Sequence, residues 1–530
     1  MNRKKGCAMI ALVMAVLLAG CSGGNNTNTS TGGAASSSPS ASQQPASEKP
    51  AEQKTIELDW MNNPGLIGEN SYGQKKLEEM FNIKLKKTYP IAHGDYLQKQ
   101  QLQFAAGDIP DVFFVFDPAT LSKYASQGFL AEVPMEMIEQ YAPRTKAKID
   151  EQAPQGWFYT NVDSRNYGLP TFYFTGQFTT KQLWRTDLLE QAGITAIPST
   201  IDEMTEAFAA LKKIGVTGMS SNGQSFYNAF HSVFGAYGVL PPQWMLKDGA
   251  VVNSAVQQES KDALAKLAEW YAAGYIDPDF ITGKDIDTKF TTGKLAFMDA
   301  AHVSSLDADN PNSAASVVKA NSSTGTIDFG PMPVGPGGQS GGWAWGTSGN
   351  IWAFGKQLEK EPEKMQRALE IMDALQNDEE YWLPLAWGEE GVHWTYKDAG
   401  AGVAGGLIHP DPYNDNVKLQ ENGIVDISTG TTFWGAQANL DIVGKYYGKE
   451  MLDKYNLYNK PVWDIFGKSD ILPSSGKYWG DLIKLKTETF ARIIIGDLPL
   501  TAFDDFVKEW NDKGGAELEK EANALYQSIQ

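Results

Sequence analysis

Cysteine is almost absent from this chain. The 530 residues include only two, Cys7 and Cys21, both close to the N-terminus. The rest of the chain therefore has no internal disulfide and no thiolate metal site. The five histidines, at positions 93, 231, 302, 393 and 409, do not have the spacing of metal ligands. We expect neither a metal nor another cofactor.

Positive charge is also scarce. The sequence has 45 Lys and Arg residues against 64 Asp and Glu residues, which gives a formal net charge of −19. Loss of Arg3, Lys4 and Lys5 would lower that charge by three, to −22. Nucleic acid and anionic lipid surfaces repel so acidic a protein. We therefore expect no nucleic-acid partner.

Long apolar runs are missing after residue 18. The one short run, Cys7–Leu18, follows three basic residues, which is typical of a secretory signal and too short for a permanent membrane span. It ends in Leu18-Ala19-Gly20-Cys21, which resembles the lipobox of bacterial lipoproteins. The resemblance implies a signal peptide over residues 1–20 and a diacylated Cys21 as lipid anchor. The alternative is an ordinary signal peptide with an incidental cysteine.

The next segment lacks aromatic residues and has hardly any charge. Residues 22–50 are mainly Ser, Gly, Asn, Thr, Ala, Gln and Pro, which cannot bury enough apolar surface to fold. We expect a disordered tether over residues 21–54. A flexible chain of that length has a root-mean-square reach of roughly 30 Å. It would hold a folded body near the extracytoplasmic face of a membrane.

Apolar periodicity indicates an α/β body. Alternation over 56–60 predicts a half-buried strand, and the continuous apolar run 112–116 predicts a strand covered on both faces. Between them we expect helices at 70–80 and 96–106 and a strand at 83–89. Such alternation of strands and helices predicts a parallel sheet.

Three later helices have recognisable ends. Thr200-x-x-Glu203 is a capping box, and the helix that it opens should end near Gly215. Other helices are expected from Ser254 to Gly274 and from Thr501 to Gly514. A strand is expected over 326–333.

Seven loose motifs follow one another along residues 55–530. They are Ala105–Val112, Tyr167–Pro170, Arg185–Leu189 with Thr200–Glu203, Phe290 with Gly293–Met298, Pro331–Gly337, Gly388–Trp394, and Ile495-Gly496 with Trp510, Gly514, Gly515 and Tyr526. In this order they make the body similar to family 1 of the extracellular solute-binding proteins, the carbohydrate-capturing subunits of ATP-binding-cassette (ABC) importers. The large lipoprotein members of Bacillus- and Paenibacillus-like bacteria are the most similar.

This resemblance implies a two-lobe periplasmic-binding-protein-like α/β fold of class II type, with a hinge and an interlobe cleft. Lobe one would hold residues 55–168 plus 325–361, and lobe two residues 169–324 plus 362–530. It also implies a monomeric, lipid-anchored receptor of Gram-positive type. That receptor would capture an oligosaccharide, pass it to ABC permease subunits and break no bond.

Candidate ligand-binding residues follow the strands of the first lobe, since ligands of open α/β sheets bind beyond the carboxyl ends of strands. The first strand ends in Trp60-Met61-Asn62-Asn63, and the buried strand ends in Phe116-Asp117. Trp60, Asn62, Asn63 and Asp117 could stack on or hydrogen-bond to a sugar. The alternatives are a core Trp and loop-capping Asn or Asp residues.

Tryptophans in turn-rich segments supply further candidates. They are Trp343, Trp345, Trp387, Trp394 and Trp434, together with His393. A Trp is more often part of the core than a stacking surface, but we expect at least one of these to contact sugar.

Other functions have weaker support. Gly338-Gln339-Ser340-Gly341-Gly342 matches the hydrolase elbow, but the surrounding prolines and Trp-Ala-Trp favour a hairpin turn. Asp285-Ile286-Asp287 lacks the glycine and glutamate of a calcium loop. A secreted carbohydrate-active hydrolase and a binding protein that feeds a membrane sensor remain the alternatives.

Overall fold

The computed structural model describes residues 54–528 apart from 63–67, 90, 92–94, 153–155, 172–180, 225–228, 242, 302, 344–349, 425–447, 458–460 and 463–471. Cys21, Asn63, Trp345 and Trp434 lie outside the described residues. Two main sheets organise the rest.

The first sheet has five strands in the order β2-β1-β3-β14-β6. These are β2 (Ile83–Thr88), β1 (Ile56–Met61), β3 (Val112–Val115), β14 (Asn350–Phe354) and β6 (Gly168–Thr171). β1 is parallel to β2 and β3, as the sequence predicts, whereas β14 is antiparallel to β3 and β6. Every residue of β3 is buried, which confirms the strand predicted from the apolar run.

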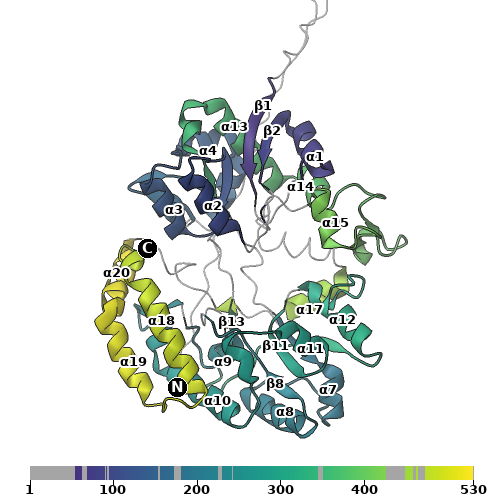
Figure 1. The fold of residues 1–530 in the computed structure, drawn as a ribbon, viewed down its shortest axis with the longest axis vertical. Helices are drawn as coiled ribbons and strands as arrows, with labels where there is room; N and C mark the ends of the chain where they lie inside the picture. The colour runs from purple at the N-terminus through teal and green to yellow at the C-terminus, as the bar shows by residue number, and fades with distance from the viewer. Residues whose placement is uncertain are drawn as a thin grey trace, which may run out of the picture. The chain divides into compact units, whose positions relative to one another are not determined.

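Helices cover this sheet and share one core with it. They are α1 (Tyr72–Phe81), α2 (Tyr96–Ala105), α3 (Pro118–Ser126), α4 (Met135–Tyr141), α5 (Pro143–Gln152), α6 (Gly156–Thr160), α13 (Pro362–Asn377) and α14 (Glu379–Ala386). Figure 1 shows α13 beside β1, although some three hundred residues separate them in the chain. Arg144 of α5 joins the buried Asp373 of α13 at 2.8 Å, which fixes this distant segment against the N-terminal helices.

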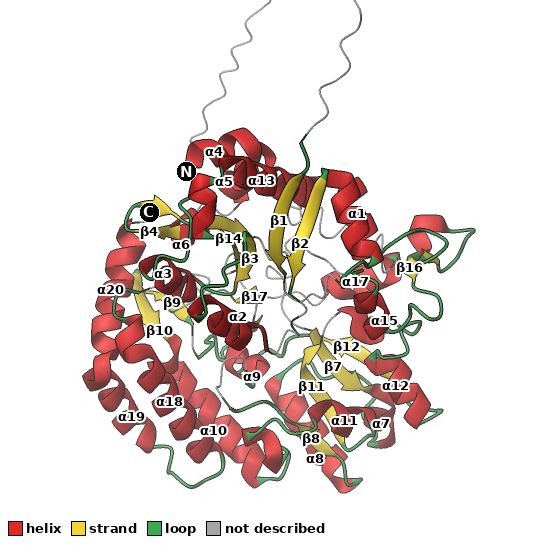
Figure 2. Cartoon of the chain, turned by 45° about the horizontal axis from the view of Figure 1, so that its top comes forward, coloured by secondary structure: helices red, strands yellow, loops and turns green. Residues whose placement is uncertain are grey.

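The second sheet has four strands in the order β12-β7-β11-β8 (Figure 2). These are β12 (Ile327–Gly330), β7 (Lys181–Arg185), β11 (Leu295–Ala301) and β8 (Thr217–Met219). β11 is parallel to β8, so the carboxyl ends of these two strands lie at the same sheet edge. β7 is antiparallel to both of its neighbours.

The helices of the second core include a C-terminal group. They are α7 (Thr186–Gln191), α8 (Ile201–Lys213), α9 (His231–Ala236), α10 (Gln258–Ala272), α11 (Ile286–Thr291), α12 (Ala314–Asn321), α18 (Ser475–Ile494), α19 (Ala502–Trp510) and α20 (Ala516–Ser528). Phe490 of α18 and Phe506 of α19 belong to the same core as Trp270 of α10. At Gly514 the backbone has φ 113°, and a Cβ there would lie 2.4 Å from the Tyr478 ring, so glycine ends the helix as predicted.

Two helix starts differ in detail from the sequence prediction. The helix expected from Ser254 begins at Gln258, because residues 254–256 form a 3-10 turn and Gln257 is extended. The helix after Thr501 is present, but the Thr501 side chain makes no capping hydrogen bond. Thr501 has helical backbone angles (φ −63°, ψ −21°) instead of the extended ones of a typical N-cap.

The remaining elements are short. The strands are β4 (Asn161–Val162), β5 (Arg165–Asn166), β9 (Trp244–Lys247), β10 (Ala250–Asn253), β13 (Gly342–Trp343), β15 (Thr395–Tyr396), β16 (Leu407–Ile408) and β17 (Pro461–Val462). The helices are α15 (Asn416–Glu421) and α17 (Lys449–Leu457).

The sheet pairings differ from the expected lobe ranges at two places. β12, expected in lobe one, pairs with β7 in the four-stranded sheet. α13, expected in lobe two, contributes Leu369 and Met372 to the core of the five-stranded sheet. Hydrogen bonds and packing between distant segments decide both assignments, and local sequence contains no signal for them. We therefore propose three lobe boundaries, between β6 and β7, between β13 and β14, and between α15 and α17, because α18, α19 and α20 belong to the second core.

Candidate functional site

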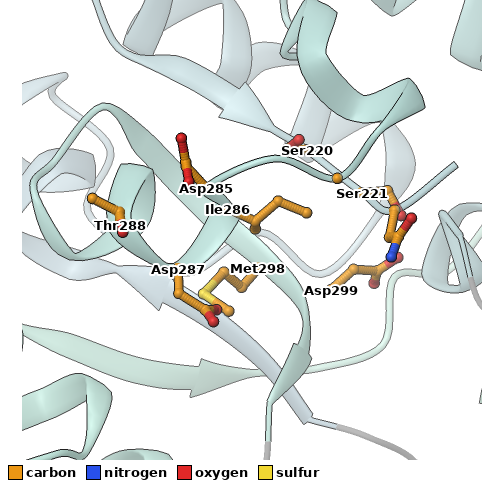
Figure 3. Close-up of a pocket in the computed structure, with 10 residues that line it drawn as sticks. Ser220, Ser221, Asp285, Ile286, Asp287, Thr288, Met298 and Asp299 are labelled. Atoms are coloured by element: carbon orange, nitrogen blue, oxygen red, sulfur yellow. The ribbon is translucent and has the colours of Figure 1, made fainter. Parts of the chain in front are cut away.

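A hollow lies at the carboxyl ends of the parallel strands β8 and β11. Its volume is about 500 Å³. The lining comes from the segment after β8, from β11 itself and from the start of α11: Ser220, Ser221, Asn222, Gly283, Asp285, Ile286, Asp287, Thr288, Met298 and Asp299. We call it the β8–β11 hollow (Figure 3). Ligands of α/β sheets generally bind at this edge.

Asp299 is the most firmly held of the lining residues. Its side chain is buried, Gln182 Nε2 donates to Oδ1 at 2.9 Å, and the Ser232 backbone N–H donates to Oδ2 at 3.3 Å. The His231 ring contacts the Asp299 carbonyl through Nε2, and its Nδ1 accepts from the Trp343 N–H at 3.1 Å. A carboxylate oxygen has two lone pairs, so each oxygen of Asp299 can accept one more hydrogen bond.

The segment after β8 offers a hydroxyl and an amide. Ser221 Oγ accepts from the Phe230 N–H at 2.9 Å, which leaves the hydroxyl proton available to a ligand. Ser220 Oγ donates to Asp277 at 3.0 Å, and Lys289 holds the same Asp277 by an ion pair of 2.7 Å. At Gly283, with φ +63°, a Cβ would lie 2.8 Å from the side chain of Asn222. Glycine there lets Asn222 lie at the rim.

The start of α11 adds two carboxylates and an apolar strip. Asp285 has a left-handed backbone (φ 57°) at the N-cap of α11, yet its side chain makes no capping hydrogen bond. Asp287 and Thr288 are exposed. Figure 3 shows Ile286 and Met298 between the Asp285–Asp287 side and the Ser221–Asp299 side. The hollow thus combines this apolar strip, formed by Ile286 and Met298, with polar groups on both sides of it.

These carboxylates do not form a metal centre. Among the residues that the structure describes, no group of three or more His, Cys, Asp or Glu side chains could hold a metal ion. Within the same described part, no helix is both long and apolar enough to span a membrane.

The end of β1 holds two of the predicted residues. Trp60 is buried, and its ring packs edge-on against Trp352 with centroids 5.8 Å apart. Asn62 is 1% exposed, and neither its amide oxygen nor its amide nitrogen has a hydrogen-bond partner among the residues that the structure describes. Buried polar groups normally have partners, so this amide is a strong candidate for a ligand contact. Asp117 instead caps α3, accepting from the Thr120 N–H at 2.7 Å.

The predicted residues of the 387–394 segment come together. The Trp387 ring stacks on His409 at 4.6 Å and 14°. His393 lies between the rings of Tyr72 and Tyr413, and burial lowers the pKa of its imidazole. Trp394 Nε1 donates to the Gly388 carbonyl at 3.1 Å.

A second hollow, of about 490 Å³, lies between α1 and α14. Trp394 lines it together with Tyr72, Lys75, Lys76, Glu79, Leu383, Pro384, Gly388, Glu389 and Glu390. Of the predicted ligand-binding residues that the structure describes, Trp394 is thus the one that lines this hollow. Trp343 is placed elsewhere: it is 2% exposed and belongs to the core of the four-stranded sheet.

The turn lies at residues 335–338 and not over 338–342, and the expected hairpin is not formed by the described strands, because β12 pairs with β7 and β13 with β17. The Ser340 hydroxyl donates to the Met332 carbonyl at 3.0 Å, and the Gly338 N–H donates to the Gly335 carbonyl at 3.0 Å. No helix follows within the described residues 338–343, so this serine lacks the strand-turn-helix setting of a hydrolase nucleophile.

The sequence analysis did not select the residues of the β8–β11 hollow as ligand-binding. The missed signal is Ser220-Ser221-Asn222, polar residues directly after a strand, which is the pattern that led to Asn62. The run Thr217-Gly218-Met219 is too short to be recognised as a strand from its periodicity. Asp285 and Asp287 were considered only as a calcium loop.

Comparison with known proteins places the chain in a family. The family model "Bacterial extracellular solute-binding protein" matches residues 69–382. Lipoprotein LipO of Bacillus subtilis (strain 168) is 23% identical, with 99% of each chain covered. The polygalacturonan/rhamnogalacturonan-binding protein YtcQ of the same strain is 22% identical, with 98% of each covered.

Solved structures show the same fold. The alginate-binding protein AlgQ2 without calcium ion matches with a TM-score of 0.62 and 17% identity, over 90% of this chain and 98% of that one. FusA, an ABC-transporter substrate-binding protein of S. pneumoniae in complex with kestose, matches with a TM-score of 0.61 and 18% identity, over 90% and 99%. The fold is the two-lobe periplasmic-binding-protein-like α/β fold that the sequence predicts, and the chain belongs to the bacterial extracellular solute-binding protein family.

Proposed function

We propose that this protein captures an oligosaccharide outside the cell and delivers it to the permease subunits of an ABC importer. In this proposal Cys21 carries the lipid anchor and the protein breaks no bond in its ligand. The observation that carries the proposal is the β8–β11 hollow, at the sheet edge where α/β folds bind ligands.

The chemistry of the hollow suits a sugar ring. A pyranose presents hydroxyl groups around its edge and apolar C–H groups on its faces. The side chains of Ile286 and Met298 could cover such a face, while Ser221, Asn222 and Asp299 could bond the hydroxyls. Asp299 is already fixed by hydrogen bonds from Gln182 and Ser232, so ligand binding would cost little conformational entropy of its side chain.

The buried amide of Asn62 would give a second contact in the other sheet. A primary amide donates and accepts at once, which matches a hydroxyl or a pair of neighbouring hydroxyls. Trp387, His393 and Trp394 remain candidates for the same ligand. Asn63, Trp345 and Trp434 stay predictions because they lie outside the described residues.

The names of the relatives agree with a saccharide ligand. YtcQ is named as a polygalacturonan/rhamnogalacturonan-binding protein, AlgQ2 as an alginate-binding protein, and FusA was solved with kestose. The name of LipO supports the lipoprotein assignment. These similarities support the class of ligand and not its identity.

A thermal-shift screen against oligosaccharides tests the proposal. Ligand at a hundred times its dissociation constant should stabilise the protein by about 2.7 kcal/mol, and mass spectrometry should recover the saccharide intact. Asp299→Ala should weaken binding at least tenfold, whereas Asp504→Asn, which changes an exposed ion pair with Lys261, should not. Absence of a shift with every saccharide would refute the sugar assignment, and a shortened product would indicate a hydrolase.

A further inference from the structure

The β8–β11 hollow carries charge of one sign. Three of its ten lining residues are carboxylates, Asp285, Asp287 and Asp299, and none of the ten is Lys or Arg. The carboxylates lie on both sides of the Ile286–Met298 strip (Figure 3). A sugar unit in the hollow would therefore have carboxylates on two sides.

The basic residues near the hollow do not offset this charge. Lys289 is paired with Asp277 and Asp279, each at 2.7 Å. Arg185 is paired with Asp187 and also donates to the Phe290 carbonyl. Lys284 precedes Asp285 in the chain, but it is exposed and does not line the hollow.

The His231 ring lies 3.5 Å from Asp299 Oδ1, and Lys181 lies close to this sheet edge, opposite Ala301 of β11. The Lys181 side chain is 1% exposed, and burial lowers the pKa of its ammonium group to about 7. Its positive charge near neutral pH is therefore only partial. A cation so placed cannot neutralise the exposed Asp285 and Asp287.

Carboxylates and anions repel each other, whereas carboxylates accept hydrogen bonds well from neutral hydroxyls. We propose that the β8–β11 hollow selects uncharged sugar units and discriminates against uronic acids. This inference rests on the proposed function and adds to it the charge class of the ligand. Asp285 and Asp287 are its specificity residues, because both line the hollow, both are exposed, and neither makes an ion pair with another described residue.

Matched pairs of oligosaccharides provide the test. Each neutral trisaccharide, of gluco, manno and galacto type, is compared by calorimetry with its counterpart oxidised at C6 to the uronic acid. In every pair of which one member binds, we expect the neutral member to bind at least tenfold more tightly. Raising the salt concentration should reduce this ratio of affinities between the neutral and the acidic member, since salt screens exposed charges.

In the double variant Asp285→Asn/Asp287→Asn, the ratio of affinities between the neutral and the acidic trisaccharide should fall at least threefold. Asparagine tolerates the left-handed backbone of position 285, so the fold should persist, and circular dichroism and the melting temperature verify this. Asp504→Asn is the matched control and should leave the difference unchanged. Equal or tighter binding of a uronide by the natural sequence would refute the charge selection alone. If neither the neutral nor the acidic member of any pair binds, the sugar-binding function itself is refuted.

Discussion

At the scale of single residues, Asn62 is the side chain whose structure most directly suggests a function. It is buried at the end of β1, and its amide has no hydrogen-bond partner within the described part of the chain. Burial of an unpaired polar group costs about 1–3 kcal/mol, and a protein retains such a cost where a ligand makes use of the group. The sequence predicts the end of a half-buried strand here, followed by polar residues, but only the structure shows that the Asn62 amide is buried without a partner among the described residues.

We expect Asn62→Leu to raise the free energy of unfolding of the ligand-free protein by about 1 kcal/mol or more, because it removes an unpaired buried amide. The same variant should bind oligosaccharide at least tenfold more weakly. Urea unfolding and calorimetry measure the two effects. Asn166 is the matched control: its buried amide donates to Val133 and Gly168 at 3.0 Å, so Asn166→Leu should destabilise the protein. A less stable Asn62→Leu with unchanged affinity would contradict the assignment.

Lys486 has no assigned function, and its burial predicts a pH dependence of stability. It lies in α18 at 0% exposure, and burial lowers the pKa of its ammonium group from 10.5 to about 7. Between these values the unfolded chain binds the proton and the folded chain does not, so stability rises with pH over this range. The loss of folding stability caused by burying the charged ammonium group is fully present below pH 7.

We therefore expect Lys486→Met to stabilise the protein most below pH 7, by up to about 5 kcal/mol at about 1.4 kcal/mol per pKa unit. The difference from the natural sequence should shrink as the pH approaches 10.5. Urea unfolding at several pH values measures it. Lys484→Met, at an exposed position of the same helix, should show little effect at any pH. A constant gain across the range would indicate a packing effect instead of a titration.

At the scale of elements, the most complete local signal in the sequence is the capping box of α8. Glu203 N–H donates to Thr200 Oγ1 at 3.1 Å, and the Glu203 carboxylate accepts from the Thr200 N–H at 3.2 Å. This confirms the predicted start of the helix. Hydrogen bonds from Ser199 and Thr200 also lower the pKa of Glu203.

Thr200→Ala should lower the free energy of unfolding by about 1 kcal/mol, because the Glu203 N–H loses its acceptor. Denaturant unfolding at neutral pH measures the change. Thr292→Ala is a suitable comparison, since the exposed Thr292 hydroxyl bonds only to carbonyls of its own helix. An equal effect of the two substitutions would mean that the capping bonds contribute nothing specific.

Elements with a strong local pattern were predicted, and elements without one were not. The buried run of β3 and the apolar face of α19 with its glycine stop have such patterns. The three-residue β8 is too short for one, and with it the Ser220–Asn222 side of the hollow was missed. Trp343 was a candidate for sugar contact because it lies in a turn-rich segment, but it is buried in the core with its backbone N–H bonded to His231. Its partner is 112 residues away, beyond any local signal.

At the scale of the whole molecule, the lipid anchor and the binding function are separable in our proposal. Cys21→Ala should move the protein from the membrane fraction to the soluble fraction, because acyl chains supply the membrane affinity at about 0.8 kcal/mol per buried methylene. Its affinity for oligosaccharide should not change. Fractionation and calorimetry on the same preparation measure both. Loss of binding in the released protein would show that the anchored segment also contributes to the ligand site.

The sequence by itself determined the α/β class and the elements β1, α1, β2, α2 and β3, which follow from local patterns of apolar periodicity that act over a few residues. The family follows from the resemblance of the ordered motifs, and the export signal with its lipobox-like end stays a prediction. Only the tertiary structure decided that β12 joins the four-stranded sheet, that α13 completes the first core, and that residues near 220, 285 and 299 form one hollow. Hydrogen bonds and packing between segments far apart in the chain determine these arrangements, and no local pattern encodes them.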